Sequence, residues 1–312
     1  MSVEEELTRH SPDKDTLLTI GVFDGVHLGH KHLISQLVEL AGRRDLLPGV
    51  VTFHRNPQEV LSPQTGIPFL TDLEERSRLL EKEGVALVVP LSFTREWAEL
   101  GARGFVGLLM KHLRMRGLVI GADFALGRGR EGDAAALRLL GSEMGFSVDV
   151  VPPAKLNGEV VSSTLIRQAL AGGDMTKVRR MTGRDFSLHG RVVTGAGRGA
   201  GMGIPTANLE IDPEHALPLD GVYATRAYID GRSYRSMTNI GRNPTFGDSE
   251  RGVEVYIIDY SGDLYGGELS IDIVERLRGE ERFSSVAELK KQIDEDVKKG
   301  KAILDAGKVN QV

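Results

Sequence analysis

Leu17-Leu-Thr-Ile-Gly-Val-Phe23 is a short apolar run that continues through Asp24-Gly-Val-His-Leu-Gly-His30 into a helical repeat of apolar residues. The run predicts a buried strand, and the repeat over residues 28–41 predicts a helix. His27 and His30 stand three residues apart at the start of that helix, where unpaired backbone N–H groups and the helix dipole attract anions. This stretch therefore predicts a strand, a turn and a helix that together bind an anionic ligand.

Strands and helices alternate from this stretch to about residue 182. Further strands are predicted at 50–53, 85–89, 117–121 and 147–151, and further helices at 72–83, 105–112 and 134–144. This alternation predicts a parallel sheet that is covered by helices on both faces. Ligands of such sheets bind beyond the carboxyl ends of the strands, so we expect the site in the loops after residues 23, 53 and 121.

The pattern becomes β-rich from Phe186 onward. Short strands are predicted at 188–193, 221–229, 234–239, 253–259 and 269–274. Their close spacing without helices predicts an antiparallel sandwich or a small barrel. A last helix is predicted behind the capping box Ser285-Val-Ala-Glu288. We therefore expect two domains, residues 1–182 and 183–312, with frayed ends over residues 1–15 and 306–312.

Composition excludes several classes of protein and site. The 312 residues include no cysteine, which excludes disulfides, thiolate metal sites and cysteine nucleophiles. No apolar run reaches a membrane-spanning length, and the acidic first residues do not resemble a signal peptide, so we expect a cytoplasmic protein. With 39 basic and 44 acidic residues the chain lacks the positive excess that nucleic-acid binding requires. We expect small-molecule ligands and no nucleic-acid or membrane partner, and leave weak self-association open.

Two other interpretations of His27 and His30 are a metal-binding pair and two ordinary surface histidines. A metal pair is disfavoured because cysteine is absent and no third ligand lies nearby in the sequence. The whole string from Gly21 to His30, placed between a strand and a helix, resembles the signature of the nucleotidylyltransferase superfamily. Its form Gly-x-Phe-Asp-Gly-x-His-x-Gly-His resembles the bifunctional riboflavin kinase/FAD synthetase family within that superfamily.

Three further segments of the first half are similar to motifs of this family, in the family's order. Thr52-Phe-His-Arg-Asn-Pro57 matches the frame Thr-Phe-x-Pro-His-Pro, with Arg55 and Asn56 in place of the proline and histidine. Gly121-Ala-Asp-Phe-Ala-Leu-Gly127 matches a second motif, with Leu126 in place of an aromatic residue. In Val161-Ser-Ser-Thr-Leu-Ile-Arg167 the hydroxyls alone would indicate only a helix N-cap. Within the ordered set they and the arginine indicate a triphosphate clamp.

A glycine-rich segment opens the second half. Six glycines fall within residues 190–203, a density typical of a loop whose amides surround phosphates, although the Walker ending is missing. Pro205-Thr-Ala-Asn208 then resembles the riboflavin kinase motif of the family, in which the threonine and asparagine hold magnesium and the ATP phosphates. Ala200 stands where that family has an arginine, and Arg198 lies two positions earlier. Weaker kinase activity is therefore expected.

Later segments resemble the remaining kinase motifs in order: Gly221-Val-Tyr223, Asn239-Ile-Gly-Arg-Asn-Pro-Thr245, Glu254-Val-Tyr-Ile-Ile-Asp259, Asp263-Leu-Tyr-Gly266 and Arg278-Gly-Glu-Glu-Arg-Phe283. A carboxylate on a strand is more often a solvated surface residue than a base. The resemblance implies the opposite for Glu254, which would take the proton of the riboflavin 5′-hydroxyl.

The resemblance covers about residues 17 to 300 and implies an enzyme that uses ATP and Mg²⁺ twice. It would convert riboflavin to flavin mononucleotide (FMN), and FMN to flavin adenine dinucleotide (FAD). The implied fold is α/β, with a Rossmann-like nucleotidylyltransferase domain followed by a small antiparallel β-barrel and a C-terminal helix. Two alternatives remain, namely a homologue with one activity, weakened through Ala200 or through Asn56 and Leu126, and a non-catalytic flavin- or nucleotide-binding protein.

The implied site residues fall into four groups. The catalytic residues would be Glu254, His27, His30 and Arg167. ATP would contact Gly21, Phe23, Asp24, Gly25, His27, His30, Ser163, Thr164 and Arg167 in the first domain, and Gly199, Gly203, Thr206 and Asn208 in the second. Flavin would contact Phe53, Asn56, Pro57, Asp123, Phe124, Glu254 and Arg278, although core packing explains Phe53, Pro57 and Phe124 about equally well. Magnesium would be held by Thr206 and Asn208.

Overall fold

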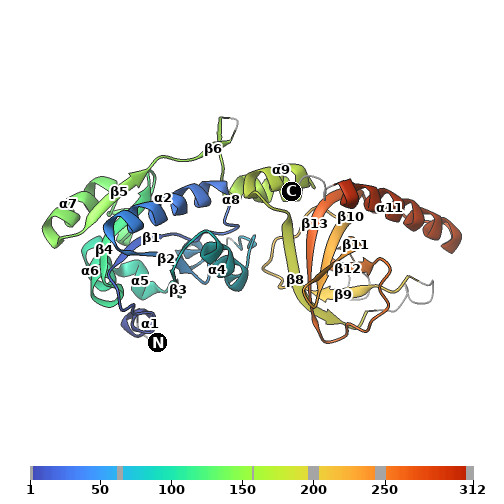
Figure 1. Ribbon diagram of the computed structural model, residues 1–312, viewed down its shortest axis with the longest axis horizontal. Coiled ribbons are helices and arrows are strands. Elements are labelled where there is room, and N and C mark those ends of the chain that lie inside the picture. The colour runs from blue at the N-terminus through green and yellow to red at the C-terminus, as the bar shows by residue number, and fades with distance from the viewer. Residues whose placement is uncertain (1–2, 62–65, 157, 196–203, 243–250, 307–312) are drawn as a thin grey trace. The chain divides into compact units, whose positions relative to one another are not determined.

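A computed structural model describes residues 3–61, 66–156, 158–195, 204–242 and 251–306 (Figure 1). The chain divides into two compact units, residues 1–163 and 164–312. Within the described ranges no helix is long and apolar enough to cross a bilayer. A cytoplasmic location and weak self-association stay predictions, as does the domain boundary after residue 182.

The first unit is built on a five-stranded parallel sheet. Its strands are β1 (Thr16–Ile20), β2 (Leu47–Phe53), β3 (Leu87–Leu91), β4 (Met115–Gly121) and β5 (Ser147–Val151). They lie in the order β3-β2-β1-β4-β5, with every neighbouring pair parallel. The chain passes outward from β1 through β2 to β3 and then returns to β4 on the other side of β1. This reversal creates a switch point between β1 and β4, which is where ligands bind in open parallel sheets.

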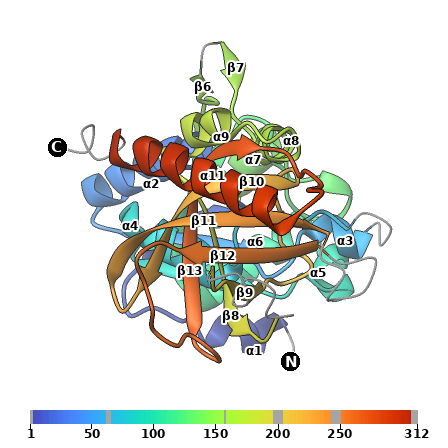
Figure 2. The same cartoon turned by 90° about the vertical axis from the view of Figure 1, so that its right-hand side faces the viewer.

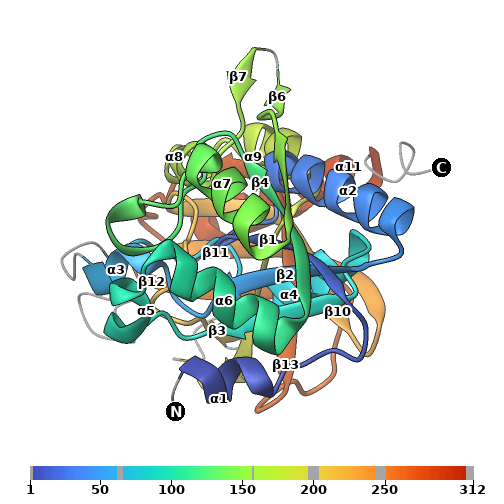
Figure 3. The same cartoon turned by 90° about the vertical axis from the view of Figure 1, so that its left-hand side faces the viewer.

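Helices cover both faces of this sheet, as the alternating pattern predicts. On one face α2 (Leu28–Arg44) and α4 (Leu73–Lys82) pack on alternate strand residues such as Leu17 and Val50. On the other face, α6 (Ala102–Leu113) and α7 (Ala134–Met144) pack on the neighbouring residues of the same strands, and Figure 3 shows them in front of β1 and β2. The remaining short elements of this unit are α1 (Val3–Thr8), α3 (Pro57–Leu61), α5 (Arg95–Glu99), a 3₁₀ turn (Arg128–Arg130), β6 (Lys155–Leu156) and β7 (Glu159–Val160).

Two expectations for the first unit are wrong. The expected frayed end contains α1, because Val3 and Leu7 are buried in the core and the Glu6 carboxylate accepts a hydrogen bond from the backbone N–H of Ser92 at 2.9 Å. The first strand ends at Ile20 rather than at Phe23. Phe23 is buried, but its backbone takes a φ of 53°, which no strand allows.

The second unit is a closed antiparallel barrel, which decides between the two β architectures that strand spacing allowed. Its six strands follow the order β10-β11-β12-β9-β8-β13. Their bounds are Phe186–Val193 for β8, Ala207–Glu210 for β9, Gly221–Ile229 for β10, Arg232–Arg242 for β11, Arg251–Ile257 for β12 and Glu268–Arg278 for β13. Two helices precede them, α8 (Ser163–Ala171), which begins on the last residue of the first unit, and α9 (Met175–Thr182).

The C-terminal helix α11 (Val286–Ala306) packs on the outside of the barrel, as expected (Figure 2). Its Leu304 and Val297 join a cluster with Ala224 and Met237. Gly300 allows this close packing, because a Cβ at that position would meet the Met237 side chain.

Strand alternation places the barrel side chains on two faces. On β12, the buried residues Val253, Val255 and Ile257 point inward, and Glu254 and Tyr256 between them point outward. The inward face also holds three fully buried hydroxyl groups, since Thr225 Oγ1 lies 2.7 Å from Ser236 Oγ and 2.8 Å from Thr238 Oγ1. Glu254 therefore lies on the outer surface of the barrel, not in its core.

Candidate functional site

His27 and His30 meet at the N-terminus of α2. His27 is the N-cap residue, and its Nδ1 accepts a hydrogen bond from the His30 backbone N–H at 3.3 Å. The two imidazole rings stack, with centroids 3.6 Å apart and planes at 17°. The Phe23 ring packs edge-on against His30 at 5.1 Å. The structure therefore brings the two predicted phosphate-binding imidazoles together beyond the end of β1.

The backbone between β1 and α2 is strained. Phe23, Gly25 and Val26 all have positive φ, at 53°, 82° and 36°. Such a conformation is a genuine outlier for a β-branched residue like Val26, and each non-glycine case costs on the order of 1–3 kcal/mol. Gly25 is required for a second reason, because a Cβ there would lie 2.9 Å from the Leu70 side chain. The buried side chains of Phe23 and Val26 hold this turn in place.

The carboxylate and the carbonyl of Asp24 both accept hydrogen bonds from other residues of the protein. Its carboxylate accepts hydrogen bonds from the backbone N–H groups of Leu70, at 2.9 Å, and Thr71, at 3.1 Å. The Thr71 hydroxyl in turn accepts from the Gly25 N–H at 3.0 Å. The Asp24 carbonyl accepts from the Ser163 hydroxyl at 2.9 Å, which places the first residue of α8 beside the turn. Asp24, predicted to contact ATP, therefore also fastens the turn to residues 70–71.

Arg76 is a residue of this region that the sequence patterns missed. Its side chain is fully buried, and its guanidinium donates to the carbonyls of Phe53, at 2.7 Å, and Val22, at 3.1 Å. Because the predicted helix 72–83 is rich in charged residues, its sequence predicts a solvent-exposed side chain at Arg76. The spacing could have indicated its burial, because Arg76 lies three residues before Leu79 and four before Leu80, on the same buried face of α4.

The predicted flavin residues of the first unit differ in burial and in the segments that carry them. Phe53 lies in the core with its ring edge-on to Phe93 at 5.6 Å, which is the packing role left open for it. Asn56 accepts a hydrogen bond from the Gln58 N–H at 3.1 Å and precedes α3, which begins at Pro57. Beyond β4, Asp123 is exposed, and Phe124 packs on the core.

The other predicted ATP residues of this site also have defined places. Gly21 follows β1 directly and donates its N–H to the Val51 carbonyl at 3.0 Å. Thr164 and Arg167 lie on α8, in the second unit. Leu126, which replaces an aromatic residue of the family motif, is buried in the core and bridges to Gly132.

Burial and electrostatic repulsion from two neighbouring side chains lower the pKa of His30 well below the ordinary value of 6.5. Burial is the largest cause, and the charges of His27 and Arg76 act in the same direction. Its Nδ1 is buried and has no hydrogen-bond partner among the described residues. The imidazole is therefore neutral at pH 7.

This lowered pKa predicts a pH-dependent stability. Unfolded His30 binds a proton below about pH 6.5, whereas the folded side chain does so only at lower pH. Between those values the folded state loses up to about 1.4 kcal/mol per pH unit relative to a variant, His30→Phe, that cannot titrate. Urea denaturation at pH 5.5 to 7.5 measures this, with the fluorescence of Trp97, the single tryptophan and buried in the first unit, as the signal.

The matched control is His32→Phe, which removes another imidazole from α2. The wild type and His30→Phe are expected to diverge as the pH falls. If their free energies of unfolding stay parallel over the whole range, the assignment of a lowered pKa to His30 is wrong.

In the barrel, strand register aligns three polar residues. Glu254 on β12 lies opposite Asn239 on β11 and opposite Asn208 on β9. Side chains that are directly opposite in antiparallel strands have Cβ atoms about 4.5–5.5 Å apart. Thr206 immediately precedes β9. The structure therefore groups the predicted base with the predicted magnesium residues, and it adds Asn239, which was quoted only as part of a motif.

Asn208 is suited to hold a cation. Its side chain is buried, and its Oδ1 accepts no hydrogen bond from the described residues. Gly195 lies against its amide, since a Cβ there would collide with it. An uncommitted amide oxygen is a ligand type that Mg²⁺ accepts. The described ranges contain no group of three acidic or histidine residues able to hold a metal alone.

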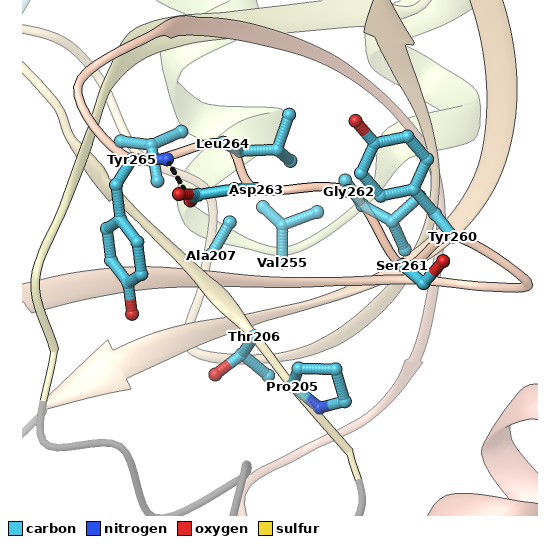
Figure 4. Close-up of a pocket in the computed structure, with 12 residues that line it drawn as sticks. Pro205, Thr206, Ala207, Val255, Tyr260, Ser261, Gly262, Asp263, Leu264 and Tyr265 are labelled. Carbon is cyan, nitrogen blue, oxygen red and sulfur yellow. Dashed lines mark hydrogen bonds between the residues drawn. The ribbon is translucent and has the colours of Figure 1, made fainter.

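A pocket opens beside Thr206 at one end of the barrel (Figure 4). Its apolar wall comes from inward-facing strand residues and from the loop between β12 and β13. In that loop the Asp263 carboxylate accepts a hydrogen bond from the Tyr265 N–H at 3.0 Å, drawn dashed in Figure 4. The lining residues include Val192, Val255, Ile257, Tyr260 and Leu264.

Arg278, predicted to contact flavin, is bound to α11. Its guanidinium forms an ion pair with Asp296 at 2.9 Å and lies over the Phe283 ring at 5.7 Å. Both charged side chains are largely buried. Arg278 therefore fastens the end of β13 to the helix, and its contact with flavin stays a prediction. Gly199 and Gly203, with Arg198, Ala200 and Thr245, lie outside the described residues.

Comparison with known proteins covers both units. A family model described as FAD synthetase matches residues 9–165, and one described as riboflavin kinase matches residues 182–304. The bifunctional riboflavin kinase/FMN adenylyltransferase of Escherichia coli K12 is 37% identical over 288 residues, 92% of each chain. The protein of that name from Pseudomonas fluorescens is 37% identical over 287 residues, 91% of this chain and 92% of its own.

A solved structure described as a macrolide-efflux protein from Streptococcus pneumoniae has the same fold over nearly its whole length. It superposes with a TM-score of 0.86 and 31% identity, and covers 93% of this chain and 95% of its own.

Proposed function

Because the chain belongs to the bifunctional riboflavin kinase/FMN adenylyltransferase family, we propose which of its residues carry each of the two activities. The protein phosphorylates riboflavin to FMN with ATP and transfers the adenylyl group of a second ATP to FMN, giving FAD and pyrophosphate. The observation that carries this conclusion is the presence of both family domains in one chain that matches bifunctional relatives over 92% of its length.

Adenylyl transfer takes place in the first unit, at the turn after β1. An oxygen of the FMN phosphate attacks the α-phosphorus of ATP, and the bond to pyrophosphate breaks without a covalent enzyme intermediate. Catalysis of this kind consists of alignment and charge stabilisation. The imidazoles of His27 and His30 donate to phosphate oxygens beside the N–H groups of α2. The Ser163 hydroxyl donates to the Asp24 carbonyl and so fastens residue 163 to the turn, and its contact with ATP stays a prediction. The ATP contacts of Thr164 and Arg167 stay predictions.

Riboflavin phosphorylation takes place on the outer face of the barrel. The Glu254 carboxylate accepts the proton of the riboflavin 5′-hydroxyl as that oxygen attacks the γ-phosphorus of ATP and ADP leaves. The Thr206 hydroxyl and the Asn208 carbonyl oxygen would hold Mg²⁺, which when bound neutralises charge on the phosphates. Asn239, opposite Glu254, orients that carboxylate. The weaker kinase expected from Ala200 stays a prediction.

The pocket beside Thr206 receives the adenine of the ATP used by the kinase. Its apolar wall suits a flat ring, and Thr206 at its edge lies where the phosphates must begin. Leu264→Trp is expected to fill the pocket and raise the KM for ATP in riboflavin phosphorylation by about 10- to 100-fold, because about 1.5–3 kcal/mol of apolar burial is lost. FMN adenylylation should keep its KM for ATP.

Initial rates at varied ATP concentration measure both values, with Val286→Trp, at an exposed position of the same unit, as the matched control. An unchanged KM for ATP in Leu264→Trp would place the adenine elsewhere.

Incubation of the purified protein with riboflavin, ATP and Mg²⁺, followed by chromatographic separation of the flavins, tests the function as a whole. FMN and FAD are both expected. FMN alone, or unchanged riboflavin, would contradict it.

A further inference from the structure

We propose that Arg76 is a positioning residue for adenylyl transfer, a buried cation that joins the turn after β1 to the end of β2 and so aligns the ATP and FMN phosphates. The inference rests on the proposed assignment of this reaction to the first unit. Arg76 lies on α4, outside the sequence motifs that resemble the family, and it acts through the backbone of both loops.

The guanidinium connects three segments that are distant in the sequence. Its Nη1 lies 3.1 Å from the Val22 carbonyl, 2.7 Å from the Phe53 carbonyl and 3.3 Å from Thr52 Oγ1. Its Nη2 donates to the Thr71 carbonyl at 3.2 Å. The Thr52 hydroxyl closes the network by donating to the Val22 carbonyl at 2.9 Å. The ends of β1 and β2 and the residue that precedes the N-cap of α4 therefore share one donor group.

These contacts lie between the two substrate sites. Val22 immediately precedes Phe23, whose ring packs on His30. Phe53 immediately precedes the segment 54–57 that is predicted to hold flavin. A displacement of either loop would change the separation of the attacking FMN oxygen and the α-phosphorus of ATP. In such reactions a misplacement of about 1 Å costs about 100-fold in rate.

The charge of Arg76 is also unusual. A buried guanidinium is normally paired with a carboxylate, yet within the described ranges Arg76 has no carboxylate oxygen within 4.0 Å and donates mainly to neutral carbonyls. Burial lowers its pKa, while Asp24 and Asp72 oppose that effect from a longer distance. Its Nε has no hydrogen-bond partner among the described residues. An incompletely compensated buried cation favours anions nearby, which suits a site that must bring two phosphorylated substrates together.

The same field acts on His30. The groups that face this imidazole are His27 at the cap of α2, the Phe23 ring, and Arg76 from α4, and His27 and Arg76 both disfavour a positive charge there. Arg76 thus adds to the effect of burial, which is the largest cause of the lowered pKa of His30. This effect can be measured separately from turnover.

Two substitutions separate charge from geometry. Arg76→Met removes the charge and the donors but keeps an unbranched apolar side chain, and we expect the kcat of FMN adenylylation to fall by about 100-fold. Arg76→Lys keeps the charge without the planar fork, and we expect it to retain about 10-fold more activity than Arg76→Met. Arg78→Met, exposed on the same helix, is the matched control, and riboflavin phosphorylation by each variant serves as the internal reference.

The second readout is the pKa of His30, measured by NMR titration of histidine-labelled protein and assigned with His30→Gln. It is expected to rise in Arg76→Met and to stay low in Arg76→Lys. A purely structural role would lower stability and activity in both variants without this difference. If Arg76→Met fails to fold, Arg76→Lys decides, because a lower kcat with a wild-type circular dichroism spectrum supports the proposal and a wild-type kcat overturns it.

The proposal is also overturned if Arg76→Met retains its adenylylation rate within about threefold of the wild type, or if the His30 pKa does not move. Failure of the proposed function gives a different result, since the wild type would then form no FAD from FMN, and the His30 titration would still report on Arg76.

Discussion

Glu254→Gln is expected to abolish most riboflavin phosphorylation and to leave FMN adenylylation unchanged. The amide has nearly the shape of the carboxylate but cannot accept the hydroxyl proton, and loss of a general base typically costs 10²- to 10⁴-fold in rate. The register of β11, β12 and β9 keeps the side chain between Asn239 and Asn208 in the variant. Separate assays, one with riboflavin and one with supplied FMN, measure the two activities on the same preparation.

The control for this substitution is Glu268→Gln, which neutralises an exposed carboxylate at the start of β13. It is expected to leave both activities near the wild-type values. If Glu254→Gln lost FAD formation from FMN as well while remaining folded, the assignment of two separate sites would fail. A kinase rate close to that of the wild type would exclude Glu254 as the base.

The double variant His27→Asn, His30→Phe is expected to show the opposite pattern. Each imidazole supplies a hydrogen bond to a charged phosphate, worth about 1.5–3 kcal/mol, so the loss of both should reduce FMN adenylylation by about 10²- to 10⁴-fold. Asparagine is chosen at position 27 because the side chain caps α2 through a hydrogen bond from the His30 N–H, and asparagine caps helices well. Riboflavin phosphorylation should continue, so that FMN accumulates.

The matched control is His32→Gln on the same helix, which should convert riboflavin to FAD as the wild type does. Chromatography of the flavins at fixed times distinguishes the patterns directly. FAD formation by the double variant at a near-normal rate would mean that the phosphates are bound elsewhere.

Periodicity and spacing predicted much of this fold, because each cue was local. Alternating strands and helices predicted the parallel sheet, and the short interval between His27 and His30 predicted their meeting at one helix end. The residue pairs that were missed join distant segments. Asp24 bonds to Leu70, 46 residues away, and Arg76 bonds to Val22, 54 residues away. No pattern within a window of ten or twenty residues contains such a pair.

Apolar character also misled at one place. Phe23 completed an apolar run and so resembled the end of a strand, whereas its backbone has already turned, and only tertiary packing maintains that conformation. Phe53 has the core packing that was left open for it, and its contact with flavin stays a prediction. The four-residue strand β9 was missed because it is too short for an alternating pattern, although it carries Asn208.

The three hydroxyls sealed inside the barrel have a consequence for its assembly. The Thr225 hydroxyl contacts the hydroxyls of both Ser236 and Thr238. All three buried hydroxyls are therefore paired only in the observed register of β10 and β11. A slip of one residue would turn these groups outward and force the flanking side chains of β11 into the interior. Any such misfolded chain would also lose the alignment of Asn239 with Glu254. These buried hydroxyls thus favour the one register of β10 and β11 in which the residues of the proposed kinase site are aligned.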